Sequence, residues 1–124
     1  MNIQEYKELL KSSEAKSKYH NKKVEFRGFT FDSVKERDYY LYLLDREKRG
    51  EVRDISRQYK FEIIPSFTTP AGEKIKAITY LADFYFFDIV SNSWRVIDVK
   101  GYKTDVYKLK KKLLAYKGIY IEEV

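Results

Sequence analysis

The 124-residue chain has no cysteine, a single histidine (His20) and no apolar run near the roughly 20 residues needed to span a membrane. The absence of cysteine excludes disulfide frameworks, thiolate zinc sites and cysteine nucleophiles. One histidine makes a histidine-based metal site or a Ser-His-Asp triad hard to build. Any acid–base or metal chemistry must therefore use carboxylates, lysines and tyrosines.

Charged and aromatic side chains, in contrast, are abundant. The chain has 25 Lys and Arg against 19 Asp and Glu, a net charge of +6, with 12 Tyr and 8 Phe. This basic balance is compatible with a polyanionic partner, although many basic proteins bind nothing acidic. The hydrophobic content of 44% excludes a disordered chain. Because the N-terminal residues lack the apolar region of a secretory signal, we expect a cytoplasmic protein without membrane association.

The length predicts one domain, residues 1–124, with an N-terminal helix or arm (1–23) before a core at 24–124. Apolar spacing predicts a helix within residues 3–19, whose polar second half is either a solvated tail or a basic arm that contacts phosphates. The remaining pattern predicts a strand at 24–27, a helix at 33–49, strands at 57–64, 74–87 and 94–99, a helix at 104–117 and a strand at 119–122. The last strand–helix–strand indicates a parallel pair. We therefore expect a mixed α/β fold with a central mixed sheet flanked by helices.

Most of the residues that could form a catalytic or metal-binding site lie between Tyr80 and Lys112. Asp83 lies within a strand-like run, and the next such run ends in Asp98-Val99-Lys100-Gly101. A hairpin turn near residues 91–93 would make Asp83 and Asp98 neighbours. Because strand side chains alternate between faces, Asp98 and Lys100 are expected on the same side. A carboxylate inside an apolar strand is costly unless it has a partner or a metal, which makes Asp83 informative.

These residue types suit a divalent metal and a phosphate. Mg²⁺ prefers hard oxygen ligands, so Asp83, Asp98 and the main-chain carbonyl of Val99 are the candidate ligands, with Mn²⁺ as an alternative ion. Lys100 would orient or deprotonate a water, or stabilise developing negative charge. Lys103, Thr104, Lys108 and Lys111 are candidate phosphate contacts. The competing interpretation is a chance Asp-x-Lys triplet followed by a solvated lysine-rich helix face.

Glu36 has two interpretations. Ser33 followed by Glu36 forms a capping-box pattern at a helix start, which gives Glu36 a reciprocal capping role. Glu36 also shares the predicted core-facing stripe with Tyr40, Leu43, Leu44 and Glu47, so it is alternatively an acid directed at the same site as Asp83.

The order of these motifs resembles the PD-(D/E)XK nuclease superfamily. The resemblance rests on Ser33-x-x-Glu36, Tyr80-x-Ala82-Asp83-Phe84, the run Val96 to Gly101, and Thr104-x-x-Tyr107-x-x-Lys110, and it covers roughly residues 29–122. Ala82 stands where the superfamily has its proline. More closely, the layout resembles a small phage-encoded nuclease-like family found among replication and recombination genes, and it is similar to Holliday-junction resolvases and the endonuclease subunit of heteromeric transposases.

The resemblance implies a restriction-endonuclease-like core and a Mg²⁺-dependent DNA endonuclease. Carried over by position, Asp83 and Asp98 would be metal ligands, Lys100 the catalytic lysine and Glu36 the helix acid. It further implies a homodimer that cuts branched DNA or a Holliday junction in the bacterial host cytoplasm. Two alternatives stay open: a non-catalytic nucleic-acid-binding module on the same scaffold, and a phage regulator that binds a host protein through its aromatic surface.

Overall fold

The structure is a computed structural model that describes residues 23–99 and 103–124. The chain divides into two compact units, Met1–Glu51 and Val52–Val124. The predicted helix at 3–19, His20 and Lys100 lie outside the described residues. The prediction of a single domain stays a prediction.

The described part of the first unit contains a short hairpin and one helix. Strands β1 (Val24–Phe26) and β2 (Phe29–Phe31) pair antiparallel. The turn between them places Arg27 and Gly28 at φ 49° and 81°, a left-handed conformation that glycine adopts without steric cost. The strand predicted at 24–27 is therefore present, whereas β2 was missed because it is only three residues long and directly follows a glycine.

Helix α2 (Val34–Lys48) has nearly the predicted bounds because both of its ends are encoded locally. The Ser33 side chain accepts a hydrogen bond from the Glu36 N–H at 3.1 Å, which satisfies one of the free donors of the first turn. Gly50, at φ 74°, follows the C-terminus. The predicted apolar stripe was only partly correct, since Leu43 is fully buried but Glu47 is exposed.

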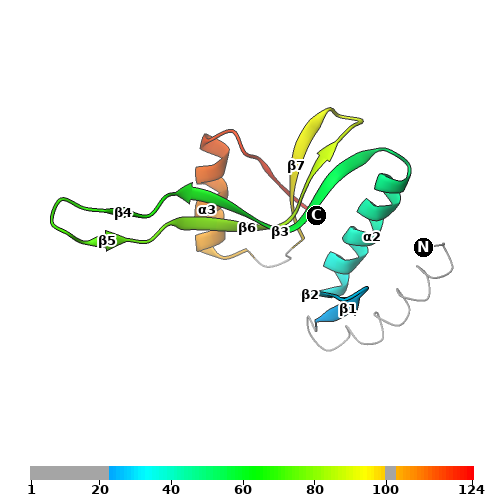
Figure 1. Cartoon of the computed structure of the whole chain (residues 1–124), viewed down its shortest axis with the longest axis horizontal. Helices are drawn as coiled ribbons and strands as arrows, with labels where there is room; N and C mark the ends of the chain where they lie inside the picture. The colour runs from blue at the N-terminus through cyan, green and yellow to red at the C-terminus, as the bar shows by residue number, and fades with distance from the viewer. Residues whose placement is uncertain (1–22, 100–102) are drawn as a thin grey trace. The chain divides into compact units, whose positions relative to one another are not determined.

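The second unit is built on a four-stranded sheet with the order β3-β6-β7-β8 (Figure 1). Its strands are β3 (Val52–Ile64), β6 (Ile78–Asp88), β7 (Ser93–Asp98) and β8 (Ile121–Glu123). The β3–β6 and β6–β7 pairs are antiparallel, and the β7–β8 pair is parallel across helix α3 (Asp105–Tyr116). The predicted mixed α/β class and the terminal parallel pair are confirmed.

Beyond the sheet, β3 and β6 continue into a second hairpin of β4 (Phe67–Thr68) and β5 (Lys74–Ile75) (Figure 1). The segment between the strands predicted at 57–64 and 74–87 thus contains a short strand, and the single strand predicted at 74–87 is interrupted. The breakers Pro70 and Gly72 lie between β4 and β5, where they form the hairpin turn.

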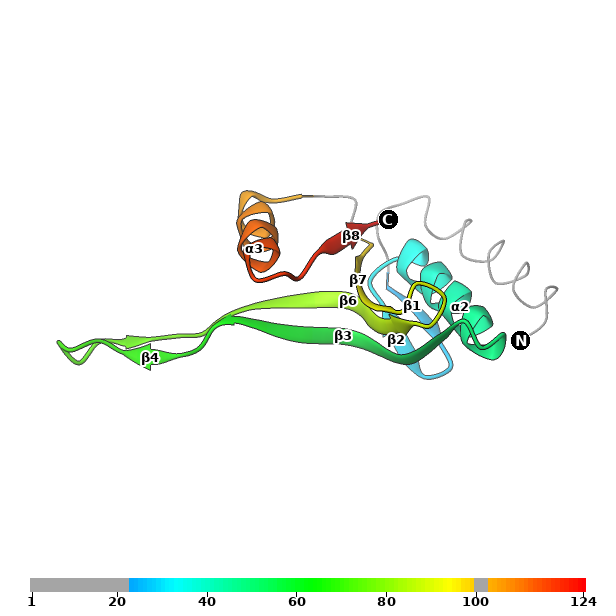
Figure 2. The same cartoon turned by 90° about the horizontal axis from the view of Figure 1, so that it is seen from above.

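Helix α3 covers one face of the sheet formed by β3 and β6 (Figure 2). Leu114 is fully buried in a cluster with five sheet residues, and burial of such a side chain stabilises the fold by about 1.5–3 kcal/mol. The cluster comprises Ile63, Tyr80, Ala82, Val96, Leu114 and Ile121.

Apolar spacing in this helix predicts a buried face of Val106, Leu109, Leu113 and Tyr116, and that prediction is largely wrong. Val106, Leu109 and Tyr116 are 61%, 57% and 93% exposed, whereas Leu113 packs against the core cluster. The buried side of the helix instead follows Tyr107 and Leu114, which are two turns apart and therefore lie on one face. Hydrophobicity alone did not distinguish these two faces.

Within residues 23–99 and 103–124, no helix has the length and apolar character required to cross a membrane.

Candidate functional site

Asp83 and Asp98 lie next to each other at the end of the β6–β7 hairpin. The ladder pairs Phe84 with Ile97, and its continuation by one residue places the two aspartates opposite each other. Each is 1% exposed. The hairpin therefore brings two carboxylates together in a buried position, where charge is costly unless it is compensated.

Hydrogen bonds from neighbouring groups fix the carboxylate oxygens. The Val99 N–H donates to Asp83 Oδ2 at 2.7 Å, and the Tyr80 hydroxyl donates to Asp98 Oδ2 at 2.6 Å. Short bonds of this kind are typical when the acceptor is ionised. The Gln58 side-chain amide lies 3.5 Å from Asp83 Oδ1. The orientation of both aspartates is thus set by their surroundings before any ligand binds.

Gln58 reaches Asp83 from an irregular point of β3. It lies between the Arg57–Phe84 and Tyr59–Ala82 pairs, opposite Asp83, and has a left-handed backbone with φ 52°. A non-glycine residue in this conformation inside a strand is strained by about 1–3 kcal/mol. Such strain persists where the surroundings fix the residue, and here it accompanies the contact with the buried acid.

A third acid, Glu123, lies beside the pair on β8. The parallel β7–β8 register aligns Asp98 with Glu123, and the Val124 N–H donates to the Asp98 carbonyl at 3.0 Å. Glu123 accepts hydrogen bonds from Lys111 at 2.6 Å and from the Tyr107 hydroxyl at 3.1 Å, and forms an ion pair with Lys103 at 3.1 Å. Glu123 is therefore paired with positive charge from α3 and the segment before it.

Ionisation of this cluster follows from its contacts. The hydrogen bond from Lys111, supported by Lys103 and Tyr107, lowers the pKa of Glu123 to about 2, against the opposing effect of burial. Burial, followed by the hydrogen bond to Asp98, raises the pKa of Tyr80. Burial and the nearby charges of Asp98 and Glu123 likewise raise the pKa of Tyr107. Both tyrosines thus remain neutral hydroxyl donors at physiological pH.

The aspartate pair can be compared with the ligands that Mg²⁺ requires. Among the described residues there is no group of three or more His, Cys, Asp or Glu arranged to hold a metal ion, so a closed protein cage is not formed there. Mg²⁺, however, usually retains several waters and binds through one or two carboxylates plus a substrate phosphate. An ionised carboxylate has about four acceptor positions, so the hydrogen bonds leave room for coordination. Asp83 and Asp98 therefore offer the hard oxygen donors that Mg²⁺ prefers, and a Mg²⁺ site formed by them and the Val99 carbonyl stays a prediction.

The described structure does not test the roles of two other predicted catalytic residues. Lys100 follows Asp98 by two positions but lies outside the described residues. Glu36 belongs to the first unit, where it is 3% exposed and donates its backbone N–H to the capping side chain of Ser33. The capping pattern at Ser33 is confirmed, and a catalytic role of Glu36 stays a prediction.

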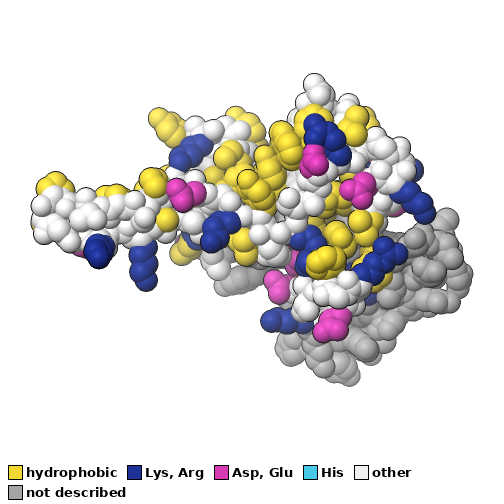
Figure 3. Space-filling model, in the orientation of Figure 1, with side chains coloured by type: hydrophobic (Ala, Val, Ile, Leu, Met, Phe, Trp, Pro, Cys, Tyr) yellow, Lys and Arg dark blue, Asp and Glu magenta, His cyan; other side chains and the backbone are white. Residues whose placement is uncertain are grey.

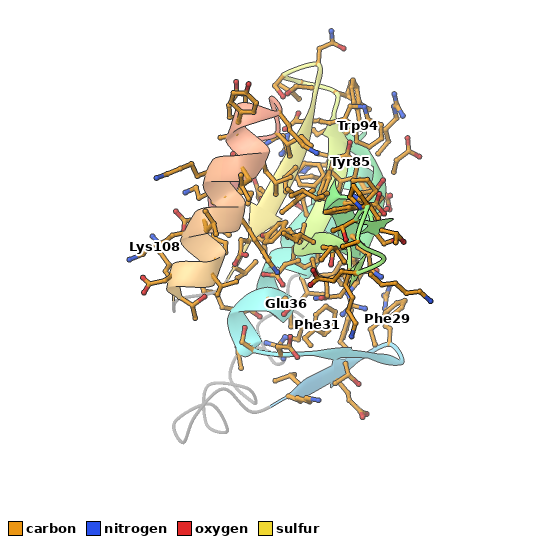
Figure 4. The ribbon with its side chains drawn as sticks, turned by 90° about the vertical axis from the view of Figure 1, so that its left-hand side faces the viewer. Phe29, Phe31, Glu36, Tyr85, Trp94 and Lys108 are labelled. Atoms are coloured by element: carbon orange, nitrogen blue, oxygen red, sulfur yellow. The ribbon has the colours of Figure 1, made fainter. Side chains whose placement is uncertain are left out.

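The predicted phosphate contacts have different surroundings. Lys103 and Lys111 bind Glu123, and the Thr104 hydroxyl accepts the Tyr107 N–H at 3.0 Å as the N-cap of α3. Lys108 is exposed and points away from the sheet (Figure 4). Lys108 is thus the one of these four most directly available to a phosphate.

Sequence reasoning did not assign a role to four residues of this cluster: Gln58, Tyr80, Tyr107 and Glu123. Gln58 reaches Asp83 through the β3–β6 register, and Tyr80 reaches Asp98 across the β6–β7 pair. Glu123 is brought in by the parallel β7–β8 register. The predicted parallel pair was the one available signal, because it places the last strand beside the Asp98 strand.

The fold and the cluster define a mixed α/β protein with a buried aspartate pair at one end of a β-hairpin. The chain belongs to the family described as "Protein of unknown function (DUF1064)", whose model matches residues 16–123. The match includes the whole cluster and all strands of the central sheet. No curated protein and no solved structure matches the chain.

Proposed function

We propose that this protein is a Mg²⁺-dependent DNA endonuclease of the PD-(D/E)XK type that acts on branched DNA, such as a Holliday junction, in phage replication or recombination. The observation that supports this most is the pairing of buried Asp83 and Asp98 on adjacent strands, with Lys100 two residues further along the chain. This is the order of acids and lysine that the nuclease resemblance implies.

The proposed roles follow from the surroundings of each group. When bound, the metal would lower the pKa of a water and stabilise charge on a phosphoryl oxygen. Asp83 and Asp98 would hold it, each oriented by the Val99 N–H or the Tyr80 hydroxyl. Lys100 would orient the attacking water or stabilise negative charge on the phosphate. Lys108 would contribute a phosphate contact that raises affinity without reading sequence.

A homodimer in the bacterial cytoplasm is part of the proposal, because a junction has two strands to cut and the resolvases that the sequence resembles act as pairs. This element rests on the resemblance alone.

The test is a cleavage assay on four-way junction, splayed-arm, single-stranded and linear duplex DNA, with Mg²⁺, Mn²⁺ or EDTA. We expect cutting that requires the metal and favours branched DNA. Asp98→Ala should reduce the rate at least about a hundredfold, the scale seen when one preorganised charged or polar group is removed from an active site.

Glu123→Gln is the matched control, because it removes a neighbouring acid that already pairs with lysines. It should cut nearly as well as the parent protein. If Asp98→Ala cuts at the parent rate while remaining folded, the site is assigned wrongly. Binding without cleavage under any divalent ion would instead support a non-catalytic DNA-binding module.

A further inference from the structure

A continuous aromatic cluster lies on the sheet of the second unit, outside the acid cluster. Its five rings come from three adjacent strands, and each ring contacts the next. The centroids of Tyr59 and Phe61 are 4.9 Å apart, those of Tyr59 and Tyr85 are 4.6 Å apart, and those of Tyr85 and Trp94 are 4.9 Å apart. Phe87 completes the cluster at 5.4 Å from Trp94. We call this set the aromatic platform: Tyr59, Phe61, Tyr85, Phe87 and Trp94.

The platform is preorganised and accessible at the same time. Tyr85 and Trp94 lie side by side with their ring planes 21° apart (Figure 4). Phe61 and Tyr85 also pack against the core cluster beneath α3, which anchors the platform to the fold. Yet Tyr59 and Trp94 are 40% and 48% exposed. Figure 3 shows hydrophobic side chains gathered over the sheet between α3 and β7. Exposed contiguous apolar surface of this kind marks interaction sites.

A cation lies against the same rings. The Arg53 guanidinium carbon is 4.3 Å from the Phe87 centroid and 5.9 Å from the Trp94 centroid, and the side chain also pairs with Asp54. The chain as a whole carries a net charge of +6. Rings combined with positive charge are complementary to a ligand that has both flat aromatic groups and negative charge. An uncharged apolar peptide would use the rings but not the charge.

We propose that the aromatic platform stacks the unpaired bases of single-stranded DNA. Bases of any sequence present a π-face, and exposed aromatic side chains on a basic sheet surface are how single strands are bound without sequence preference. Bases within a duplex are already stacked on each other and are not available. This inference rests on the proposed DNA substrate, and it favours branched structures with an unpaired arm, such as splayed-arm DNA, over a fully paired four-way junction.

The aromatic platform and the acid cluster share strand β7, which relates the proposed single-strand binding to the proposed cleavage site. Trp94 and Asp98 are four residues apart on β7, so they lie on the same face of the strand, separated by about 13 Å. We therefore expect a single strand held at Trp94 to approach the end of β7 that carries Asp98.

The experiment uses Trp94, which is the only tryptophan of the chain, as an intrinsic fluorophore. The full-length protein is titrated in EDTA, so that no cleavage occurs, with an oligothymidylate of about 12 nucleotides and separately with a blunt duplex of equal length. We expect saturable quenching of Trp94 by the single strand and much weaker quenching by the duplex. Tyr59→Leu keeps the side chain apolar but removes the ring, and should weaken single-strand binding by roughly tenfold.

Tyr116→Leu is the matched control, because Tyr116 is the same residue type, is 93% exposed and lies at the end of α3 outside the platform. It should bind the single strand as the parent does. Three results would each contradict the proposed binding of single strands by the aromatic platform. These are equal quenching by duplex and single strand, no quenching by the single strand, and an unchanged affinity of folded Tyr59→Leu. Single-strand binding without metal-dependent cleavage would refute only the nuclease proposal, and cleavage without single-strand binding would refute only the platform.

Discussion

Asp98 and Glu123 are aligned neighbours on parallel strands, yet their surroundings differ in kind. Asp98 is 1% exposed and receives the Tyr80 hydroxyl, whereas Glu123 lies nearer the surface and receives the ammonium groups of Lys111 and Lys103. A hydroxyl orients a carboxylate oxygen but leaves its negative charge in place. An ammonium group orients the oxygen and also neutralises the charge. The two adjacent acids are thus held by donors of different kinds, a neutral hydroxyl for Asp98 and ammonium groups for Glu123.

This contrast separates a structural acid from a candidate functional one. Glu123 ties β8 to α3 through two lysines and Tyr107, and its charge is compensated within the fold. The carboxylate oxygens of Asp98 and of the neighbouring Asp83 are buried and are oriented by hydrogen bonds. The following predictions test this difference, beginning with the largest effect.

Mg²⁺ should stabilise the protein through the aspartates and not through Glu123. At an ion concentration about a hundred times the dissociation constant, binding to the native state adds about 2.7 kcal/mol to the free energy of unfolding. We expect this gain in the parent protein and in Glu123→Gln, and its loss in Asp98→Ala, measured by urea unfolding with and without Mg²⁺. An equal gain in Asp98→Ala would show that the ion binds elsewhere.

Loss of the Tyr80 hydroxyl should cost more than loss of the Tyr107 hydroxyl. Tyr80→Phe leaves a buried carboxylate oxygen without this donor, which should lower the free energy of unfolding by about 1–3 kcal/mol. Tyr107→Phe removes one of several donors to Glu123, so we expect a loss of under about 1 kcal/mol. Chemical unfolding of the two variants at neutral pH gives the comparison directly. A larger loss in Tyr107→Phe would reverse the roles assigned to the two acids.

Glu123 should make the stability depend on pH in the acid range. Its pKa falls from an ordinary value of 4.5 to about 2 in the folded state, so the folded protein holds this proton less tightly than the unfolded chain. The contribution is therefore complete above pH 4.5 and is lost as the pH falls toward 2. Because Glu123 is partly solvent-accessible, we expect it to amount to only about 1 kcal/mol.

The matched variants for this effect are Glu123→Gln and Lys111→Gln, compared with the parent by unfolding at a series of pH values. Both should flatten the decline in stability between pH 4.5 and 2, because each removes one side of the pair. An unchanged acid slope in both variants would assign the decline to other carboxylates.

The sequence predicted those parts of the fold that are encoded locally. Ser33 and Thr104 mark the starts of α2 and α3 through side-chain capping, and Gly50 and Gly118 follow their ends with positive φ. The β6–β7 hairpin and its consequence, the proximity of Asp83 to Asp98, follow from alternation and one turn. Each of these signals involves only a few neighbouring residues, so it can be recognised in the sequence without knowledge of the tertiary structure.

What was missed depends on contacts distant in sequence. The exposed face of α3 was taken for its buried face, because Val106 and Leu109 are as apolar as Leu114 and only packing against the sheet distinguishes them. The contact between Gln58 and Asp83 required the β3–β6 register, which no short motif encodes. The contact between Tyr80 and Asp98 required the placement of the Tyr80 side chain across the β6–β7 pair. The aromatic platform likewise needs three strands in register before its rings meet.

The left-handed backbone of Gln58 has a consequence for how this site tolerates change. Glycine adopts the conformation at φ 52° without steric cost, so Gln58→Gly would relieve about 1–2 kcal/mol of strain. The same substitution removes the amide that faces Asp83. The backbone conformation and the positioning of the buried acid therefore favour different residues at position 58, and the chain carries the residue that contacts the acid. In a variant selected for thermal resistance alone, we expect glutamine to be replaced at position 58, and the amide contact that positions Asp83 to be lost.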